Sequence, residues 1–149
     1  SNICEDKRRI FRNDIRKYIK SNIIDYYSPQ PIMESQHTSN IENISTWSSQ
    51  NYKDILRGGK LRIGVVQKLL NLYLKYLWCF GILKNAPPHC PFDGIIIGEL
   101  NLNEPIKWTD FDSIDTYNNL VNATKIRVQG GSIAEWELSL FNKLQSLKE

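Results

Sequence analysis

A lysine inside an apolar segment and an aspartate after a proline are the residues whose types and spacing could support catalysis. Lys68 lies within 61–80, which is apolar around most of its circumference, and Asp93 follows Pro91 at the start of a predicted short helix. An amine in apolar surroundings becomes a nucleophile, whereas a carboxylate at a helix start stays ionised. The lysine could attack the sugar carbon of a damaged nucleoside while the aspartate stabilises the oxocarbenium-like charge.

Both residues also have a purely structural interpretation. At 100° per residue, one narrow stripe of the predicted helix over 61–80 carries its polar residues together with one glycine and one tryptophan, namely Gly64, Gln67, Lys68, Asn71, Lys75 and Trp78. This stripe could be the solvent-facing side of an otherwise buried helix. Asp93 could serve only as a carboxylate in a helical first turn. The sequence leaves the catalytic and the structural interpretations open.

A family resemblance rests on the same two segments. Leu61-Arg62-Ile63-Gly64-Val65-Val66-Gln67-Lys68 and Pro91-Phe92-Asp93-Gly94-Ile95-Ile96 resemble the helix-hairpin-helix DNA glycosylases. In that family a Gly-Val-Gly turn precedes the helix with the catalytic lysine, and a Pro-Val-Asp segment supplies the aspartate. The resemblance covers 61–97 and implies a glycosylase/lyase-like enzyme. It assigns the nucleophile to Lys68, the carboxylate to Asp93 and the phosphate-binding turn to Gly64.

Basic residues gather in two places that could contact nucleic acid. One group recurs every three or four residues in a helix expected over 5–26, and the other lies in 57–84, which has six basic residues and no acidic one. Aligned cations are the usual means of neutralising phosphates. The residues predicted to contact nucleic acid are Arg9, Arg12, Arg16, Lys20, Arg57, Lys60, Arg62 and Gly64.

Acidic residues gather on a different part of the chain. Residues 85–115 contain six acidic residues and one lysine. Such a surface could meet a protein partner through 99–115. A non-catalytic helical protein–protein interaction module is therefore the alternative to a nucleic-acid-associated protein.

Hydrophobic spacing predicts a single all-α domain over 1–149, with five or six helices around a central buried helix at about 61–80. Other helices are expected at 5–26, 47–57, 92–100 and 113–128, and a last one begins after the capping sequence at Ser132. Residues 28–46 are rich in Ser, Asn, Gln and Pro, and we expect a polar loop there. Gly94-Ile95-Ile96-Ile97 is the one candidate for a buried strand.

Composition narrows the function classes further. With 149 residues, 41% of them hydrophobic, and a net charge of +3, the chain is expected to form one globular domain rather than a disordered segment. Three cysteines favour a reducing, cytoplasmic location. The start, Ser1-Asn2-Ile3-Cys4, lacks a leader pattern, and two lysines within 61–80 argue against a membrane span.

No motif predicts a cofactor or a metal ion. The sequence contains no GxxxxGK[ST], GxGxxG or HExxH pattern. His37, His89, Cys79 and Cys90 lack the spacing typical of zinc ligands, so no metal is expected. The four tryptophans, Trp47, Trp78, Trp108 and Trp136, are expected to anchor the core rather than to stack on bases.

Overall fold

Helices account for all the regular secondary structure among residues 2–148, which the computed structural model describes. The six α-helices are α1 (Asn2–Asn22), α2 (Glu34–Asn51), α3 (Ile63–Cys79), α4 (Gly94–Glu99), α5 (Ile114–Val128) and α6 (Ile133–Ser146). Two 3₁₀-helices, η1 (Ile24–Tyr27) and η2 (Arg57–Gly59), lie in the connections. The expected all-α fold is confirmed, and the candidate strand Gly94-Ile95-Ile96-Ile97 forms the start of α4.

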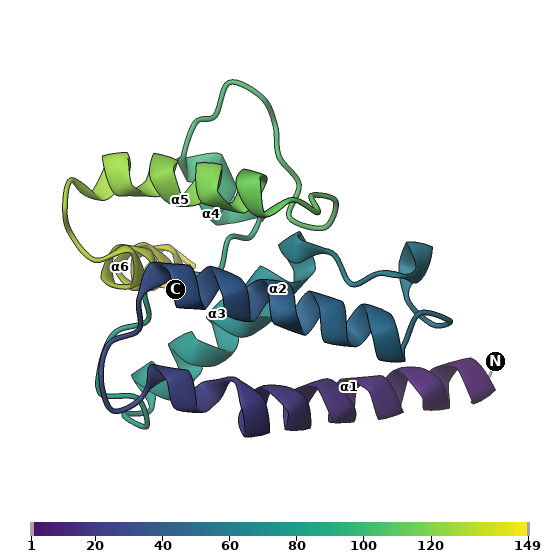
Figure 1. Ribbon diagram of the computed structural model, residues 1–149. Helices are drawn as coiled ribbons and strands as arrows, with labels where there is room; N and C mark the ends of the chain where they lie inside the picture. The colour runs from purple at the N-terminus through teal and green to yellow at the C-terminus, as the bar shows by residue number, and fades with distance from the viewer. Residues whose placement is uncertain (1, 149) are drawn as a thin grey trace.

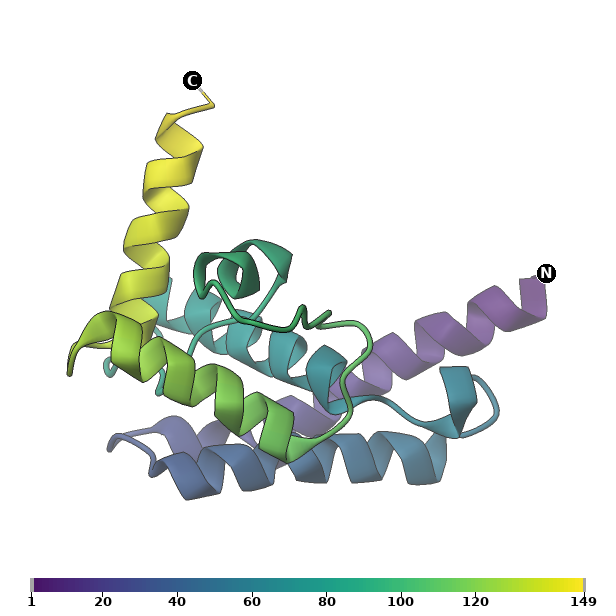
Figure 2. The same ribbon diagram turned by 90° about the horizontal axis from the view of Figure 1, so that it is seen from above.

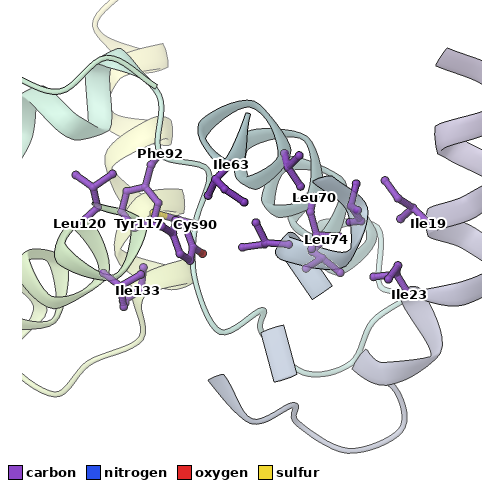
Figure 3. Close-up of a cluster of buried hydrophobic side chains, with 14 of the residues drawn as sticks. Ile19, Ile23, Ile63, Leu70, Leu74, Cys90, Phe92, Tyr117, Leu120 and Ile133 are labelled. Carbon is purple, nitrogen blue, oxygen red and sulfur yellow. The ribbon is translucent and has the colours of Figure 1, made fainter. Parts of the chain in front are cut away.

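The central position of α3 is also confirmed. Val66, Leu70 and Leu74 are fully buried. Figure 1 shows α3 crossing behind α2, with α1 on one side of these two helices and α4 and α5 on the other. We call α1 and α2 the first group of helices and α4 to α6 the second group. Figure 3 shows side chains from both groups converging on α3, with Ile19 on one side and Tyr117 on the other. One core cluster includes side chains from both groups.

The helix α1 packs through isoleucines and aromatic rings. Ile15, Ile19 and Ile23 are buried, and they recur at the helical spacing of four residues. The ring of Tyr18 stacks on Trp47 with their centroids 4.4 Å apart. The opposite side of α1 remains free for charged residues.

The prediction of a polar loop over 28–46 is wrong for the residues after Met33. Helix α2 begins at Glu34 and continues to Asn51, so it also replaces the helix expected over 47–57. Its buried face includes His37, Asn40 and Ser45, whose low hydrophobicity hid the helical period. These polar side chains can be buried because each forms a hydrogen bond, as for the Ser45 hydroxyl, which donates to the Leu61 carbonyl over 2.6 Å.

The last two helices begin where the sequence predicts. Ser113 caps α5, and the Ser132 hydroxyl accepts a hydrogen bond from the Glu135 N–H at the start of α6. In Figure 2, the C-terminal half of α6 extends away from the other helices. None of the described helices combines the length and the apolarity needed to cross a membrane.

Candidate functional site

Most of the polar stripe of α3 faces the interior, so it is not the solvent-facing side that the structural interpretation offered. Gln67 and Asn71 are fully buried, and Lys75 is 8% exposed. The Gln67 amide donates to the Phe92 carbonyl over 2.8 Å, and its oxygen accepts from the Phe92 N–H over 3.1 Å. This pair of bonds ties the segment before α4 to the central helix. A polar residue can occupy the core here because its donor and acceptor are both satisfied.

Asn71 lies at the centre of a buried chain of hydrogen bonds. Its carbonyl oxygen is 2.9 Å from Nε2 of His37, and its amide donates to the Tyr117 hydroxyl over 3.2 Å. That hydroxyl is 2.7 Å from Nδ1 of His89. His89 Nε2 then lies 3.1 Å from the Glu34 carboxylate at the surface. The chain of bonds therefore runs from an exposed carboxylate to the middle of the core.

The hydrogen-bond partners assign the ring protons of both histidines. Nε2 of His37 faces a carbonyl oxygen and Nε2 of His89 faces a carboxylate, so each Nε2 donates. Each Nδ1 accepts from a tyrosine hydroxyl: that of Tyr27 for His37, and that of Tyr117 for His89. Every member of the chain then uses its donors and acceptors consistently in the neutral state.

Burial favours the neutral forms of the histidines and of Tyr117 in this network. Burial lowers the pKa of His37 from its ordinary value to about 3, with a smaller contribution from the nearby His89. Burial also lowers the pKa of His89, although Glu34 partly opposes this. Burial raises the pKa of Tyr117. His37 and Tyr117 have no exposed surface, so the inner part of the network serves to hold α2, α3 and α5 together.

A buried ion pair joins α3 to α6. The Lys75 ammonium lies 2.9 Å from the Glu137 carboxylate and 4.0 Å from the centre of the Phe141 ring. Burial raises the pKa of Glu137, and the hydrogen bond from Lys75 partly offsets this. The pair fixes α6 against the central helix at the point where α6 leaves the core.

Lys68 and Asp93, the predicted catalytic residues, each have a structural partner. The Lys68 ammonium is 3.9 Å from the centre of the Trp108 ring, a cation–π contact. The Asp93 carboxylate accepts a hydrogen bond from the Ile96 N–H over 2.9 Å and thereby caps α4. Among the described residues, no hydrogen bond or ion pair joins the two side chains. The structure therefore does not bring the proposed nucleophile and carboxylate into contact.

Gly64 does not form an accessible phosphate-binding turn, which corrects its expected role. The Gly64 N–H donates to the Phe111 carbonyl over 3.0 Å, and a Cβ added to Gly64 would lie 2.0 Å from the Trp108 carbonyl oxygen. The Asp112 carboxylate accepts from the adjacent Ile63 N–H over 3.1 Å. The segment before α5 therefore covers the N-terminus of α3, and glycine is needed because two stretches of backbone meet there.

Of the basic residues predicted near η2, Lys60 lines a cleft of mixed charge. This cleft, about 680 Å³ in volume, lies between α2 and the segment that leads into α3. Its lining includes Ser45, Ser49, Lys60 and Asp112. Lys60 forms a 2.9 Å ion pair with Asp112. Because this cation is already neutralised, the cleft offers less to a phosphate than the sequence suggested, although Arg57 is exposed and Arg62 is half-buried.

The predicted basic face of α1 is exposed to solvent. Arg9, Arg12, Arg16 and Lys20 all lie on the surface. Arg9 forms an ion pair with Asp6, 3.1 Å away. The remaining three form no ion pair with any residue that the structure describes. Their charge is therefore available to a ligand.

A groove that the sequence did not reveal lies beside this basic face. It has a volume of about 260 Å³, its floor consists of Ile19, Leu69 and Tyr73, and its rim carries Arg16, Lys17 and Lys20. Sequence reasoning assigned all apolar positions of α3 to the core. The signal that could have revealed the groove is the polar stripe itself. Its polar side chains needed buried hydrogen-bond partners, and Leu69 and Tyr73 lie on the opposite side of α3.

The acidic segment over 99–115 is partly neutralised within the domain. Glu99 faces Arg127 at 3.8 Å, and Asp112 pairs with Lys60. Glu104, Asp110 and Asp115 are exposed. The acidic surface is therefore less continuous than its composition suggested.

Comparisons with other proteins add no family to this description. No protein-family model matches the chain, and neither the curated proteins nor the solved structures provide a significant match.

Proposed function

We propose that the chain binds nucleic acid, with phosphates contacting the exposed cations of α1. The observation that carries this proposal is the row formed by Arg12, Arg16 and Lys20, which recurs every four residues and has no carboxylate partner among the described residues. On an α-helix this spacing places a positive charge about every 6 Å along one side. A polyanion that lies along this side releases its counterions on binding, which is the main source of non-specific affinity.

The distribution of ion pairs favours this function over docking of a protein on the acidic segment. The carboxylates of Glu99 and Asp112 already face basic side chains of the same chain. The free cations of α1, in contrast, create an uncompensated positive field. An acidic surface with internal partners has less to gain from a basic partner protein than α1 has from a polyanion.

Charge reversal on α1 tests the proposal. Arg12→Glu/Arg16→Glu should weaken the binding of mixed-sequence DNA and RNA oligonucleotides at low salt by about tenfold or more. Lys107→Glu/Lys143→Glu is the matched control, because it changes the net charge equally at exposed sites elsewhere. We expect the control to bind almost as well as the unmodified chain. Absence of binding at low salt, or an equal loss in both variants, would show that the α1 cations serve only solubility.

Glycosylase-like chemistry by Lys68 and Asp93 stays a prediction from the family resemblance. If it occurs, Lys68 must leave the Trp108 ring, since its amine would attack the sugar carbon. Borohydride trapping with DNA that contains a damaged base should then yield a covalent adduct that Lys68→Ala abolishes. A chain that binds DNA without any adduct would be a binding protein and not a lyase.

A further inference from the structure

We infer that the groove between α1 and α3 binds single-stranded nucleic acid, whose bases stack on the exposed aromatic rings of α3. This inference rests on the proposed function and specifies its ligand. The cations of α1 would contact the phosphates, and Tyr73 and Tyr76 would contact the bases.

The outer side of α3 carries aromatic rings that the core does not use. Tyr73 is half-buried on the floor of the groove, whereas Tyr76 is 53% exposed and Phe80 is 79% exposed. Successive spacings of three and four residues place these rings on one side of the helix. The tryptophans, in contrast, pack against the core as the sequence predicted. The two most exposed aromatic side chains among the described residues, Phe80 and Tyr76, therefore lie on this side of α3.

The groove joins this aromatic side to the α1 cations. Arg16, Lys17 and Lys20 form its rim, and Leu69 and Tyr73 form its floor on the α3 side. Residues of α1 and α3 line this groove together. In Figures 1 and 2 the N-terminal part of α1 extends beyond the other helices. A ligand in the groove would thus meet positive charge along one wall and the Tyr73 ring on the other. It would reach Tyr76 and Phe80 by extending past the groove along the same side of α3.

Charge and aromatic surface together match a single strand better than a duplex. A single strand presents anionic phosphates and unpaired bases, and base–aromatic stacking adds affinity without sequence preference. A duplex hides its base faces and could use only the cations. An acidic amphipathic helix would match the charge and the apolar floor as well, so it is the competing occupant that the test includes. The row of cations also continues to Arg12, beyond the groove itself, as an extended polyanion requires.

Three variants and three ligands test this inference. The ligands are a fluorescent 12-nucleotide single strand, the duplex of the same sequence and a fluorescent acidic amphipathic peptide. Tyr76→Ala/Phe80→Ala removes exposed rings and leaves the core intact. Tyr76→Phe keeps a ring for stacking. Met33→Ala/Ile126→Ala is the matched control, because Met33 and Ile126 are 75% and 78% exposed on other elements.

The expected result is a preference for the single strand that depends on the rings. Tyr76→Ala/Phe80→Ala should weaken single-strand binding by about tenfold and leave duplex binding unchanged, whereas Tyr76→Phe and the control should bind normally. Equal binding of both oligonucleotides, unaffected by Tyr76→Ala/Phe80→Ala, would overturn the inference and leave the proposed function standing. Failure of both oligonucleotides to bind at low salt would overturn both. Binding of an acidic amphipathic peptide through the same rings, in the absence of oligonucleotide binding, would identify the groove as a protein-docking site and overturn both as well.

Discussion

The ammonium group of Lys75 lies 2.9 Å from the carboxylate of Glu137, and the two side chains are 10% and 6% exposed. The pair connects the central helix to the N-terminal half of α6, whose C-terminal half extends away from the other helices (Figure 2). Attraction between buried charges is strong, but so is the cost of removing them from water. The pair therefore adds little net stability, but loss of either side chain leaves the other charge buried without a partner.

Removal of one member of this pair should destabilise the domain. Lys75→Met leaves the Glu137 carboxylate buried without its partner, and we expect the free energy of unfolding to fall by about 3–5 kcal/mol. Urea denaturation measures the loss. Lys75→Met/Glu137→Leu should recover most of the stability, because it leaves no buried charge. Lys7→Ala, which breaks the exposed pair with Asp54, should cost less than about 1 kcal/mol. Equal losses in the free energy of unfolding for Lys75→Met and Lys7→Ala would show that the buried pair matters no more to stability than the exposed pair.

Some parts of this fold could be predicted because their signals are local. Ser132 precedes a regular apolar stripe, so α6 begins where expected. Helix α2 was missed because polar residues such as His37 and Asn40 form much of its buried face. The burial of Gln67 and Asn71 depends on partners 25 and 46 positions away, which no local period reveals. Sequence patterns thus locate apolar contacts more readily than buried polar ones.

The candidate site divides in the same way. The exposed cations of α1 were predictable, because their spacing alone places them on one face. The groove could not be predicted, because its position depends on which side of α3 packs against the other helices. Gly64 is a further example. The sequence singled out this glycine, but its close contact with the Trp108 backbone could not be predicted, because Trp108 lies more than 40 residues away along the chain.

Gly64→Ala should disrupt the contact between α3 and the segment before α5. The added Cβ would lie 2.0 Å from the Trp108 carbonyl oxygen, so one backbone must move. We expect a loss of several kcal/mol, comparable to overpacking of a core. Gly98→Ala is the control, since a Cβ there meets nothing within 4 Å, and it should be neutral or stabilise α4 by about 0.5–1 kcal/mol. Thermal unfolding of both variants decides the matter, and a stable Gly64→Ala chain would contradict the described packing.

The domain should lose stability in mild acid because of its two buried histidines. In the unfolded chain both bind a proton near pH 6.5, whereas burial lowers both pKa values in the folded state, that of His37 to about 3. Stability is therefore complete above pH 6.5 and falls toward pH 3, by at most about 1.4 kcal/mol per pH unit for each histidine. The raised pKa of Glu137 has the opposite sign and offsets part of this loss.

Urea denaturation at pH 7, 6 and 5 measures this dependence. The chain contains two histidines, and the slope between pH 6.5 and 5 reports their contribution less the opposite contribution of Glu137. His37→Asn removes one titrating group, and its slope should be about half that of the unmodified chain. A free energy of unfolding that stays constant from pH 7 to pH 5 would show that the histidines are not buried in the neutral form.

Asp93 should behave as a helix cap. Asp93→Ala removes the acceptor for the Ile96 N–H, and we expect a loss of about 0.5–2 kcal/mol. Asp93→Asn keeps an oxygen at the same place and should retain nearly full stability. Chemical denaturation of both variants distinguishes capping from a role of the negative charge, which Asn would not replace.

The salt dependence of oligonucleotide binding is the most direct test of nucleic-acid binding by α1. For a single strand, each neutralised phosphate contributes about −0.7 to the slope of log affinity against log salt concentration. Contacts from Arg12, Arg16 and Lys20 predict a slope of about −2, and Arg12→Ala/Arg16→Ala should reduce its magnitude by about 1.4. Lys107→Ala/Lys143→Ala should leave the slope unchanged. A slope near zero, or one that Arg12→Ala/Arg16→Ala does not alter, would contradict phosphate binding by α1.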